Sequence, residues 1–419
     1  MPVPDLRDAE ARLRQAASAL GAYLRRTPTV YSYTFSEHAG CPVWLKLENL
    51  QRTGSFKLRG ALWKVLSLSE EERARGLVAA SAGNHAQGVA LAARLLGTSA
   101  VIVMPEATAL NKIRRTQGYG AEVVLHGASW DEAQARAEEL ARAQGATLIH
   151  PFDDPLVIEG QGTVGLEILE DLPEVRTVVV PIGGGGLAAG IALAVKAVRP
   201  AVRLVGVQAE GAAPMAASFA RGTRVVEAQP RTIADGIRVG APGVHTFELV
   251  KQHYDEVVTV SDAEITDAVV QTLEKSKVVA ETAAVVGMAA LAAGKLAVRA
   301  DEQVCAVVSG GNIDLNQLAR LIESGLARQG ATHLLELRLP DVPGQLYQVL
   351  ACLAETRCNV LDVQHYRAGW QVPVGSVDVA LLIETRHPGQ GAEVEELLCA
   401  RGFALAPARP TAVSAPLRP

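Results

Sequence analysis

The segment Thr53-Gly54-Ser55-Phe56-Lys57-Leu58-Arg59-Gly60-Ala61 places one lysine next to an aromatic residue and among small residues. We expect a helix from about Ser55 to Leu66, with Ser55 as its N-cap. Lys57 then lies in the first turn, where the positive end of the helix dipole disfavours an ammonium group and lowers the pKa of the amine. Such an amine can act as a nucleophile and as a base, whereas a lysine considered alone is usually a solvated surface residue.

Four consecutive glycines follow the apolar run Thr177–Ile182 and precede a helical segment that ends near Val198. Because glycine has no Cβ atom, backbone N–H groups and the helix N-terminus can approach a phosphate closely. A tight turn is the alternative, but four glycines in succession are an unstable way to form one. The pattern favours a phosphate-binding loop made of Gly183, Gly184, Gly185, Gly186 and Leu187.

A dinucleotide-binding loop is a second interpretation of the same glycines. Gly184, Gly186 and Ala189 fit the pattern G-x-G-x-x-A, and Glu210 follows the next strand, where such proteins carry an acid for a ribose. That motif alone is weak, so a Rossmann-type nucleotide binder stays an alternative. A P-loop is excluded at this position because no G-K-[ST] accompanies the glycines.

Two further loops carry hydrogen-bonding side chains directly after an apolar strand. Ser81-Ala82-Gly83-Asn84-His85 is rich in donors and suits a carboxylate, or a hydroxyl that needs an amide partner. Taken singly, Asn84 is equally well explained as a helix cap, and His85 is more often a structural histidine than a catalyst. Ser309-Gly310-Gly311-Asn312, taken alone, indicates a turn.

Short apolar strands alternate with helices through most of the chain, and this order must position the loops. Near-continuous apolar strands between helices favour parallel sheets that are covered on both faces. Two such sheets with a cleft between them suit the length. The strands are expected at 43–48, 77–80, 101–104, 122–125, 147–149, 177–182, 203–207 and 304–308, and the helices at 6–24, 55–66, 86–96, 111–117, 130–143 and 186–198.

The composition changes near residue 330, after a segment from Gly325 to Thr332 that we interpret as a linker. The following pattern predicts strand, helix, strand, strand, helix and strand, which is the ferredoxin-like βαββαβ order. The expected bounds are 333–339, 345–356, 359–365, 376–384, 392–400 and 403–405. The proline-containing tail at 408–419 is expected to be disordered.

The composition of the 419 residues, with 49% hydrophobic and 20% charged, is that of a globular protein with more than one domain. A net charge of -5 gives no reason to expect nucleic acid or a membrane surface as a partner. The five cysteines form neither a zinc-ligand pattern nor a disulfide framework. No signal or membrane-spanning segment is evident, so we expect a cytoplasmic location.

Taken together, the four loops resemble the motifs of threonine dehydratases, which are fold-type II enzymes that use pyridoxal 5'-phosphate. The resemblance covers about residues 5–325, in the family's order. It implies two parallel-sheet subdomains, the smaller one at about 50–150 inserted in the larger, within a catalytic domain at 1–330. It implies that Lys57 forms the internal aldimine, Phe56 packs beside the ring, and Asn84 bonds the ring hydroxyl.

The same resemblance implies roles for the remaining loop residues. Gly183 to Leu187 would bind the phosphate, and Ser309 would face the pyridine nitrogen. Ser81, Asn84 and His85 would surround the substrate carboxylate, and Glu281 matches a glutamate near the ring. Residues 331–407 resemble an ACT domain through Asp341-Val342-Pro343-Gly344-Gln345-Leu346 and Asn359-Val360, which implies regulation by an amino acid. A module that only mediates assembly is the alternative.

Two positions narrow the expected reaction. Serine racemases of this family carry a serine base where this chain has Ala82, so racemisation is disfavoured. The neutral hydroxyl of Ser309 cannot keep a pyridine nitrogen protonated as an aspartate would, which favours β-elimination over transamination. The segment from Gln208 to Pro214 lacks the acid pair with which those relatives bind a divalent metal, so we expect no such site. A monovalent cation stays open.

The sequence therefore predicts an L-threonine ammonia-lyase that forms 2-oxobutanoate and ammonia, for isoleucine synthesis or threonine breakdown. L-Serine is the expected side substrate, an amino acid the expected effector, and a homodimer or homotetramer the expected assembly. A serine-preferring dehydratase, a related β-eliminating enzyme and a catalytically silent amino-acid sensor are the alternatives.

Overall fold

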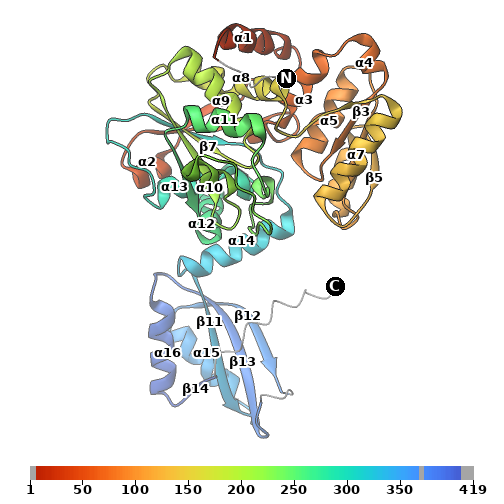
Figure 1. Cartoon of the computed structure of the whole chain (residues 1–419). Helices are drawn as coiled ribbons and strands as arrows, with labels where there is room; N and C mark the ends of the chain where they lie inside the picture. The colour runs from red at the N-terminus through yellow and green to blue at the C-terminus, as the bar shows by residue number, and fades with distance from the viewer. Residues whose placement is uncertain (1–5, 368–371, 407–419) are drawn as a thin grey trace. The chain divides into compact units, whose positions relative to one another are not determined.

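The computed structural model describes residues 6–367 and 372–406, so the expected disordered tail at 408–419 lies outside the described residues. The chain divides into two compact units, Met1–Leu315 and Asn316–Pro419 (Figure 1). Within the described ranges, every helix is too short or too polar to cross a membrane.

The larger sheet of the first unit has six strands in the order β1-β2-β10-β7-β8-β9. All neighbours run parallel except β1, which pairs antiparallel with β2. The apolar strands β7 and β10 are buried along their whole length, as a parallel sheet covered on both faces requires. The strands are β1 (Thr29–Tyr31), β2 (Val43–Leu47), β7 (Thr177–Pro181), β8 (Arg203–Ala209), β9 (Glu256–Val260) and β10 (Val304–Val308).

A smaller parallel sheet, in the order β5-β4-β3-β6, is inserted between β2 and β7 and lies beside the larger sheet (Figure 1). Alternate residues of its strands pack on α7 (Trp130–Gln144) on one face and on α5 (Asn84–Leu95) and α3 (Lys57–Leu66) on the other. The fold class expected from the sequence is thereby confirmed. The strands are β3 (Leu77–Ala80), β4 (Ala100–Met104), β5 (Glu122–Leu125) and β6 (Thr147–Leu148).

Glycines allow the backbones of three helices to touch. A Cβ atom at Gly160 of α8 (Pro155–Asp171) would lie 2.6 Å from the Cα atom of Gly60 in α3. A Cβ atom at Gly190 of α9 (Gly186–Val198) would lie 2.5 Å from the backbone nitrogen of Gly162 in α8. Helix α8 therefore connects α3, which begins with Lys57, to α9, which begins at the glycine loop.

The second unit has an antiparallel sheet in the order β12-β13-β11-β14, with its two packed helices on one face. Its order along the chain is the expected βαββαβ. The elements are β11 (Thr332–Pro340), α15 (Gln345–Thr356), β12 (Asn359–Tyr366), β13 (Ser376–Glu384), α16 (Gln390–Ala400) and β14 (Ala404–Leu405), and α14 (Leu315–Arg328) precedes them.

Two local predictions were wrong. Phe56, and not Ser55, is the N-cap of α3, and the hydroxyl of Ser55 is buried without a hydrogen-bond partner among the described residues. Ser55 instead forms a β-bridge with Gly310, which holds its backbone in place. The first half of the linker expected at Gly325–Thr332 is helical, because α14 continues to Arg328.

The remaining helices of the first unit are α1 (Ala9–Leu20), α2 (Tyr33–Ala39), α4 (Glu70–Ala74), α6 (Leu110–Gly118), α10 (Pro214–Arg221), α11 (Val244–His253), α12 (Asp262–Glu274) and α13 (Val286–Ala292), with short 3₁₀ turns η1 (Glu48–Leu50), η2 (Asp235–Ile237) and η3 (Thr282–Ala284). Helices α1 and α6 were expected from the sequence, whereas α2, α4 and α10 to α13 were not among the expected helices.

Replacing Gly160 by alanine should lower the free energy of unfolding by about 1–3 kcal/mol, because the new Cβ atom would press on the backbone of α3. Denaturant unfolding followed by circular dichroism measures the change. Gly118→Ala is the control, since a Cβ atom at that helical position meets nothing within 4 Å. Equal stability of the two variants would contradict the proposed close crossing.

Candidate active site

Lys57 is the first residue of α3, and its side chain points to the segment that follows β6. Its Nζ donates a hydrogen bond of 2.8 Å to the carbonyl oxygen of Pro151 and lies 5.2 Å from the centroid of the Phe56 ring. Burial lowers the pKa of the amine to about 8, and the negative charge of Glu281 opposes this shift. The direction agrees with the sequence prediction, with burial as the main cause.

The corner between β3 and α5 brings Asn84 into contact with Glu281, which precedes η3, and with Asn312, which follows β10. Asn84 Nδ2 donates to Glu281 Oε1 at 2.8 Å, and Asn84 Oδ1 accepts from Asn312 Nδ2 at 2.7 Å. The side chain is therefore not a helix cap but a contact across the two subdomains. Ser81 Oγ accepts from the backbone N–H of Gly83 at 3.2 Å, which holds the corner in shape.

His85 is buried, and its ring is directed away from the corner. Nε2 lies 2.9 Å from the carbonyl oxygen of Ile149, whereas Nδ1 is buried with no hydrogen-bond partner among the described residues. Burial, and next the charge of Lys57, lower the pKa of His85 to about 3, so the imidazole is neutral and donates through Nε2. Its expected place beside a substrate carboxylate stays a prediction.

The glycine loop forms a cradle that side chains would fill. A Cβ atom at Gly184 would lie 2.5 Å from the Phe152 ring, and Gly185 has a φ angle of 97° that favours glycine. Gly185 is the N-cap of α9 and provides no side-chain acceptor, so the first N–H groups of this helix are open to an anion. The loop therefore fits a phosphate group.

Ser309 and Glu281 lie at the end of β10. The carbonyl oxygen of Ser309 accepts from the backbone N–H of Phe56 at 3.1 Å, which ties β10 to the start of α3. The backbone N–H of Glu281 donates to the carbonyl oxygen of Gly310 at 3.1 Å, and a Cβ atom at Gly310 would collide with its carboxyl group. Burial, and next the charge of Asp235, raise the pKa of Glu281 to about 7.

Hydrogen bonds thus join Phe56 to Ser309 and Asn84 to Glu281, and Lys57 lies near enough to Glu281 for their charges to interact. Pro151 and Phe152 were not among the predicted site residues, and Asn312 was named only as part of the turn that begins at Ser309. Pro151 and Phe152 directly follow a predicted strand, and the carboxyl ends of parallel strands are where α/β proteins bind ligands. Their position after a strand was the sequence signal that could have identified them as site residues.

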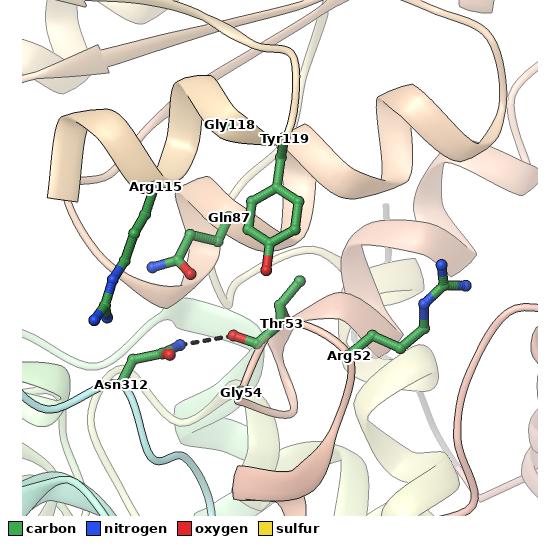
Figure 2. Close-up of a pocket in the computed structure, with 8 residues that line it drawn as sticks. All are labelled: Arg52, Thr53, Gly54, Gln87, Arg115, Gly118, Tyr119 and Asn312. Carbon is green, nitrogen blue, oxygen red and sulfur yellow. Dashed lines mark hydrogen bonds between the residues drawn. The ribbon is translucent and has the colours of Figure 1, made fainter. Parts of the chain in front are cut away.

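A pocket of about 440 Å³ adjoins this group of residues (Figure 2). Arg52 and Thr53 come from the turn before α3, and Asn312 comes from the loop after β10. Gln87, Arg115 and Tyr119 come from α5, α6 and the turn after α6. Asn312 Nδ2 donates to the carbonyl oxygen of Thr53 at 2.7 Å, the bond drawn in Figure 2, and the same atom contacts Asn84. Lys57 is not among its lining residues, so the pocket is a neighbour of the lysine site and not the site itself.

A family model described as "Pyridoxal-phosphate dependent enzyme" matches residues 21–310, the region that contains the lysine, the glycine loop and the serine. The chain belongs to this family. The cofactor expected from the sequence is thereby confirmed, and the cradle at Gly184–Gly186 and the enclosed amine of Lys57 fit it.

Two similar proteins carry the same name. L-Threonine ammonia-lyase of Thermotoga maritima is 49% identical over 392 residues, which cover 93% of this chain and 97% of that protein. L-Threonine ammonia-lyase of Geobacter sulfurreducens is 44% identical over 386 residues, which cover 92% and 94%. These relatives confirm the family that the motifs indicated.

Solved structures agree with this assignment. Threonine deaminase isoform 2 of Solanum lycopersicum superposes with a TM-score of 0.72 at 37% identity, over 77% of this chain and 89% of that one. Maize serine racemase superposes with a TM-score of 0.72 at 36% identity, over 76% of this chain and 98% of that one. The fold alone therefore does not separate elimination from racemisation.

In the cofactor-free protein, Lys57 should react with an amine-directed reagent at lower pH than an ordinary lysine. Because its pKa is about 8 and not 10.5, the neutral amine accumulates between about pH 7 and 9. Brief labelling at stepped pH, followed by peptide mass spectrometry, measures the midpoint. The exposed Lys275 in the same digest is the reference, and a Lys57 midpoint near 10.5 would contradict the enclosed site.

Proposed function

We propose that the chain is a threonine ammonia-lyase that converts L-threonine to 2-oxobutanoate and ammonia, with L-serine as a side substrate. The observation that carries this proposal is the 49% identity to a protein named L-threonine ammonia-lyase over 97% of that protein's length. The enclosed amine of Lys57, with its pKa of about 8, supports it chemically.

In this proposal each part of the site holds a different part of the cofactor. Lys57 would be the point of covalent attachment, and Phe56 would pack beside the ring. Asn84 would bond the ring hydroxyl, the loop Gly183–Leu187 would bind the phosphate, and Ser309 would face the ring nitrogen. When bound, the cofactor supplies an electron sink next to the α-carbon of the substrate.

The chain's own groups then orient the substrate and move the proton. The donors at the corner Ser81–His85, with the N-terminal N–H groups of α5, are proposed to hold the substrate carboxylate. Once substrate has replaced Lys57 on the cofactor, the freed amine of Lys57 would take the proton from the α-carbon, and the carbonyl oxygen of Pro151, 2.8 Å away, is the acceptor that orients it. In the net reaction the β-hydroxyl group leaves with that proton as water, and the neutral Ser309 favours this elimination over transamination.

Ala82 supports elimination over racemisation. A racemase needs a second base on the opposite face of the substrate, and a methyl group cannot accept a proton. The chain is therefore similar in fold to a serine racemase but has no second base at position 82. A serine-preferring dehydratase and a catalytically silent sensor stay the alternatives.

The Lys57→Ala variant should lose the absorption band of the bound cofactor and at least a thousandfold of the rate of ammonia release, because one amine serves both roles. Spectroscopy and a coupled assay with L-threonine and L-serine measure the two effects. Lys275→Ala, at an exposed position, is the control. Wild-type protein that binds the cofactor but releases no ammonia from either substrate would contradict the proposed activity and favour a sensor.

We further propose that the second unit is an ACT domain that binds an amino-acid effector. A pocket of about 280 Å³ lies at the turn Asp341–Leu346, beside His365 and Arg367. Arg367 Nε lies 3.3 Å from Asp341 Oδ1, so one cation and one anion stand at the same mouth. This arrangement suits a zwitterion, whose carboxylate would bind Arg367 and whose ammonium group would bind Asp341.

If an amino acid binds there, isoleucine or valine should change the threonine concentration for half-maximal rate several-fold, and Arg367→Ala should remove the response without changing the basal rate. Steady-state kinetics with and without each amino acid measure the effect. Arg401→Ala is the matched control, because it removes another exposed arginine pair of this unit, the one with Glu355. A full response in the Arg367 variant would sink the proposed effector site.

A cytoplasmic location and assembly as a homodimer or homotetramer belong to the same proposal. The five cysteines all lie in the described residues and are unpaired there, which supports a reducing compartment.

A further inference from the structure

Residues 149–153, here called the bridging segment, contact two parts of the site at once. The carbonyl oxygen of Ile149 lies 2.9 Å from His85 Nε2, which ties the segment to the first turn of α5. Two residues later, the carbonyl oxygen of Pro151 accepts the hydrogen bond from Lys57 Nζ at 2.8 Å. The position of this segment therefore sets the position of the acceptor for the lysine amine.

The bridging segment is itself held as a compact turn. His150 Nδ1 accepts from the backbone N–H groups of Phe152 at 3.2 Å and of Asp153 at 2.8 Å. The rings of His150 and Phe152 pack edge to face with centroids 4.7 Å apart. The Phe152 ring in turn lies against Gly184, where a Cβ atom would come within 2.5 Å of it.

Asp153 extends the segment to α11. Its Oδ2 accepts from the backbone N–H of Val244 at 2.8 Å, and its Oδ1 accepts from those of His245 at 2.9 Å and Thr246 at 3.2 Å. A Cβ atom at Gly243 would lie 2.7 Å from the Asp153 Cβ atom, so a glycine there lets the carboxylate approach. The carboxylate thus satisfies N–H groups that a helix N-terminus leaves unpaired.

Helix α11 supports the glycine loop from behind. Thr246 Oγ1 donates to the carbonyl oxygen of Gly184 at 2.6 Å, and the backbone N–H of Gly243 lies 3.3 Å from the same oxygen. A Cβ atom at Gly185 would lie 2.8 Å from Thr246 Cβ. Asp153 is therefore linked to the glycine loop through α11, and to Lys57 through Pro151.

We propose that Asp153 is a positioning residue that fixes the phosphate-binding loop relative to Lys57. This inference rests on the cofactor-holding roles proposed above for the loop and the lysine. An asparagine at this position keeps one oxygen but replaces the other by an NH₂ group, which cannot accept from the N–H of Val244 and repels it. The first turn of α11 would then shift, and the carbonyl oxygen of Gly184 with it.

The test is Asp153→Asn, with Asp154→Asn as the matched control. Asp154 is the next residue and also caps a helix, since its Oδ1 accepts from Leu156 N at 2.9 Å and Val157 N at 3.2 Å at the start of α8. Titration of the cofactor-free proteins with pyridoxal phosphate, followed by protein fluorescence, gives the dissociation constants. We expect at least tenfold weaker binding for Asp153→Asn and less than a threefold change for Asp154→Asn.

A second readout separates positioning from a general loss of stability. In Asp153→Asn the pH midpoint of the bound cofactor's absorption band should move, because the carbonyl oxygen that accepts from Lys57 is displaced. Equal unfolding midpoints of this variant and the wild-type protein would show that the fold is intact. If Asp153→Asn does not fold, Thr246→Val removes the link to Gly184 alone and should weaken cofactor binding by the same order. Thr246→Ser, which keeps the hydroxyl, should restore it.

Cofactor binding and a pH midpoint that match those of Asp154→Asn would overturn the inference. None of these measurements uses threonine turnover, so their failure differs from failure of the proposed activity. Tight cofactor binding by the wild-type protein, with weak binding by Asp153→Asn, would support the inference whatever substrate the enzyme accepts.

Discussion

The buried guanidinium of Arg59 is the interaction on which the geometry of the site depends. It donates to Glu48 through Nε and Nη2, both at 2.8 Å, and to Glu167 at 2.7 and 3.0 Å. These partners belong to η1 after β2 and to α8, so one side chain joins three elements two residues beyond Lys57. Leaving any of these charges buried and unpaired costs about 3–5 kcal/mol, which makes the arrangement hard to distort.

Much of the fold could be predicted from the sequence where apolar runs are short and bounded. The strands at Leu77–Ala80 and Val304–Val308 lie where the pattern indicated, because continuous burial leaves an unmistakable run of small apolar residues. Helix α8 was not predicted, because Gly160, Gly162 and Gly165 weaken a helical pattern. The same glycines permit the close crossings of α8 with α3 and α9. Ser55 was misassigned as a cap because a long-range bridge to Gly310 decides its backbone.

The candidate site likewise contains residues that the sequence could predict and residues that it could not. The lysine, the glycine loop and the donor-rich corner are local motifs, so residue types and spacing were enough to find them. Pro151 acts through a carbonyl oxygen and Asp153 through a backbone N–H group 91 residues away. Their position after a predicted strand indicates a ligand site, but residue types and spacing do not indicate these contacts. Burial favours the neutral forms of Lys57, His85 and Glu281. The enclosed site therefore binds a charged ligand mainly through backbone dipoles.

The pair formed by Arg367 and Asp341 differs from that enclosed site in one physical respect. Its side chains are 70% and 38% exposed, so dissolved ions reach both charges. Salt screens exposed charges over about 8–10 Å and hardly weakens fixed dipoles inside a protein. Ionic strength therefore acts unequally on the two units: an effector held by this pair would dissociate in concentrated salt, while a phosphate held by the glycine loop would stay, leaving an enzyme that works but no longer responds.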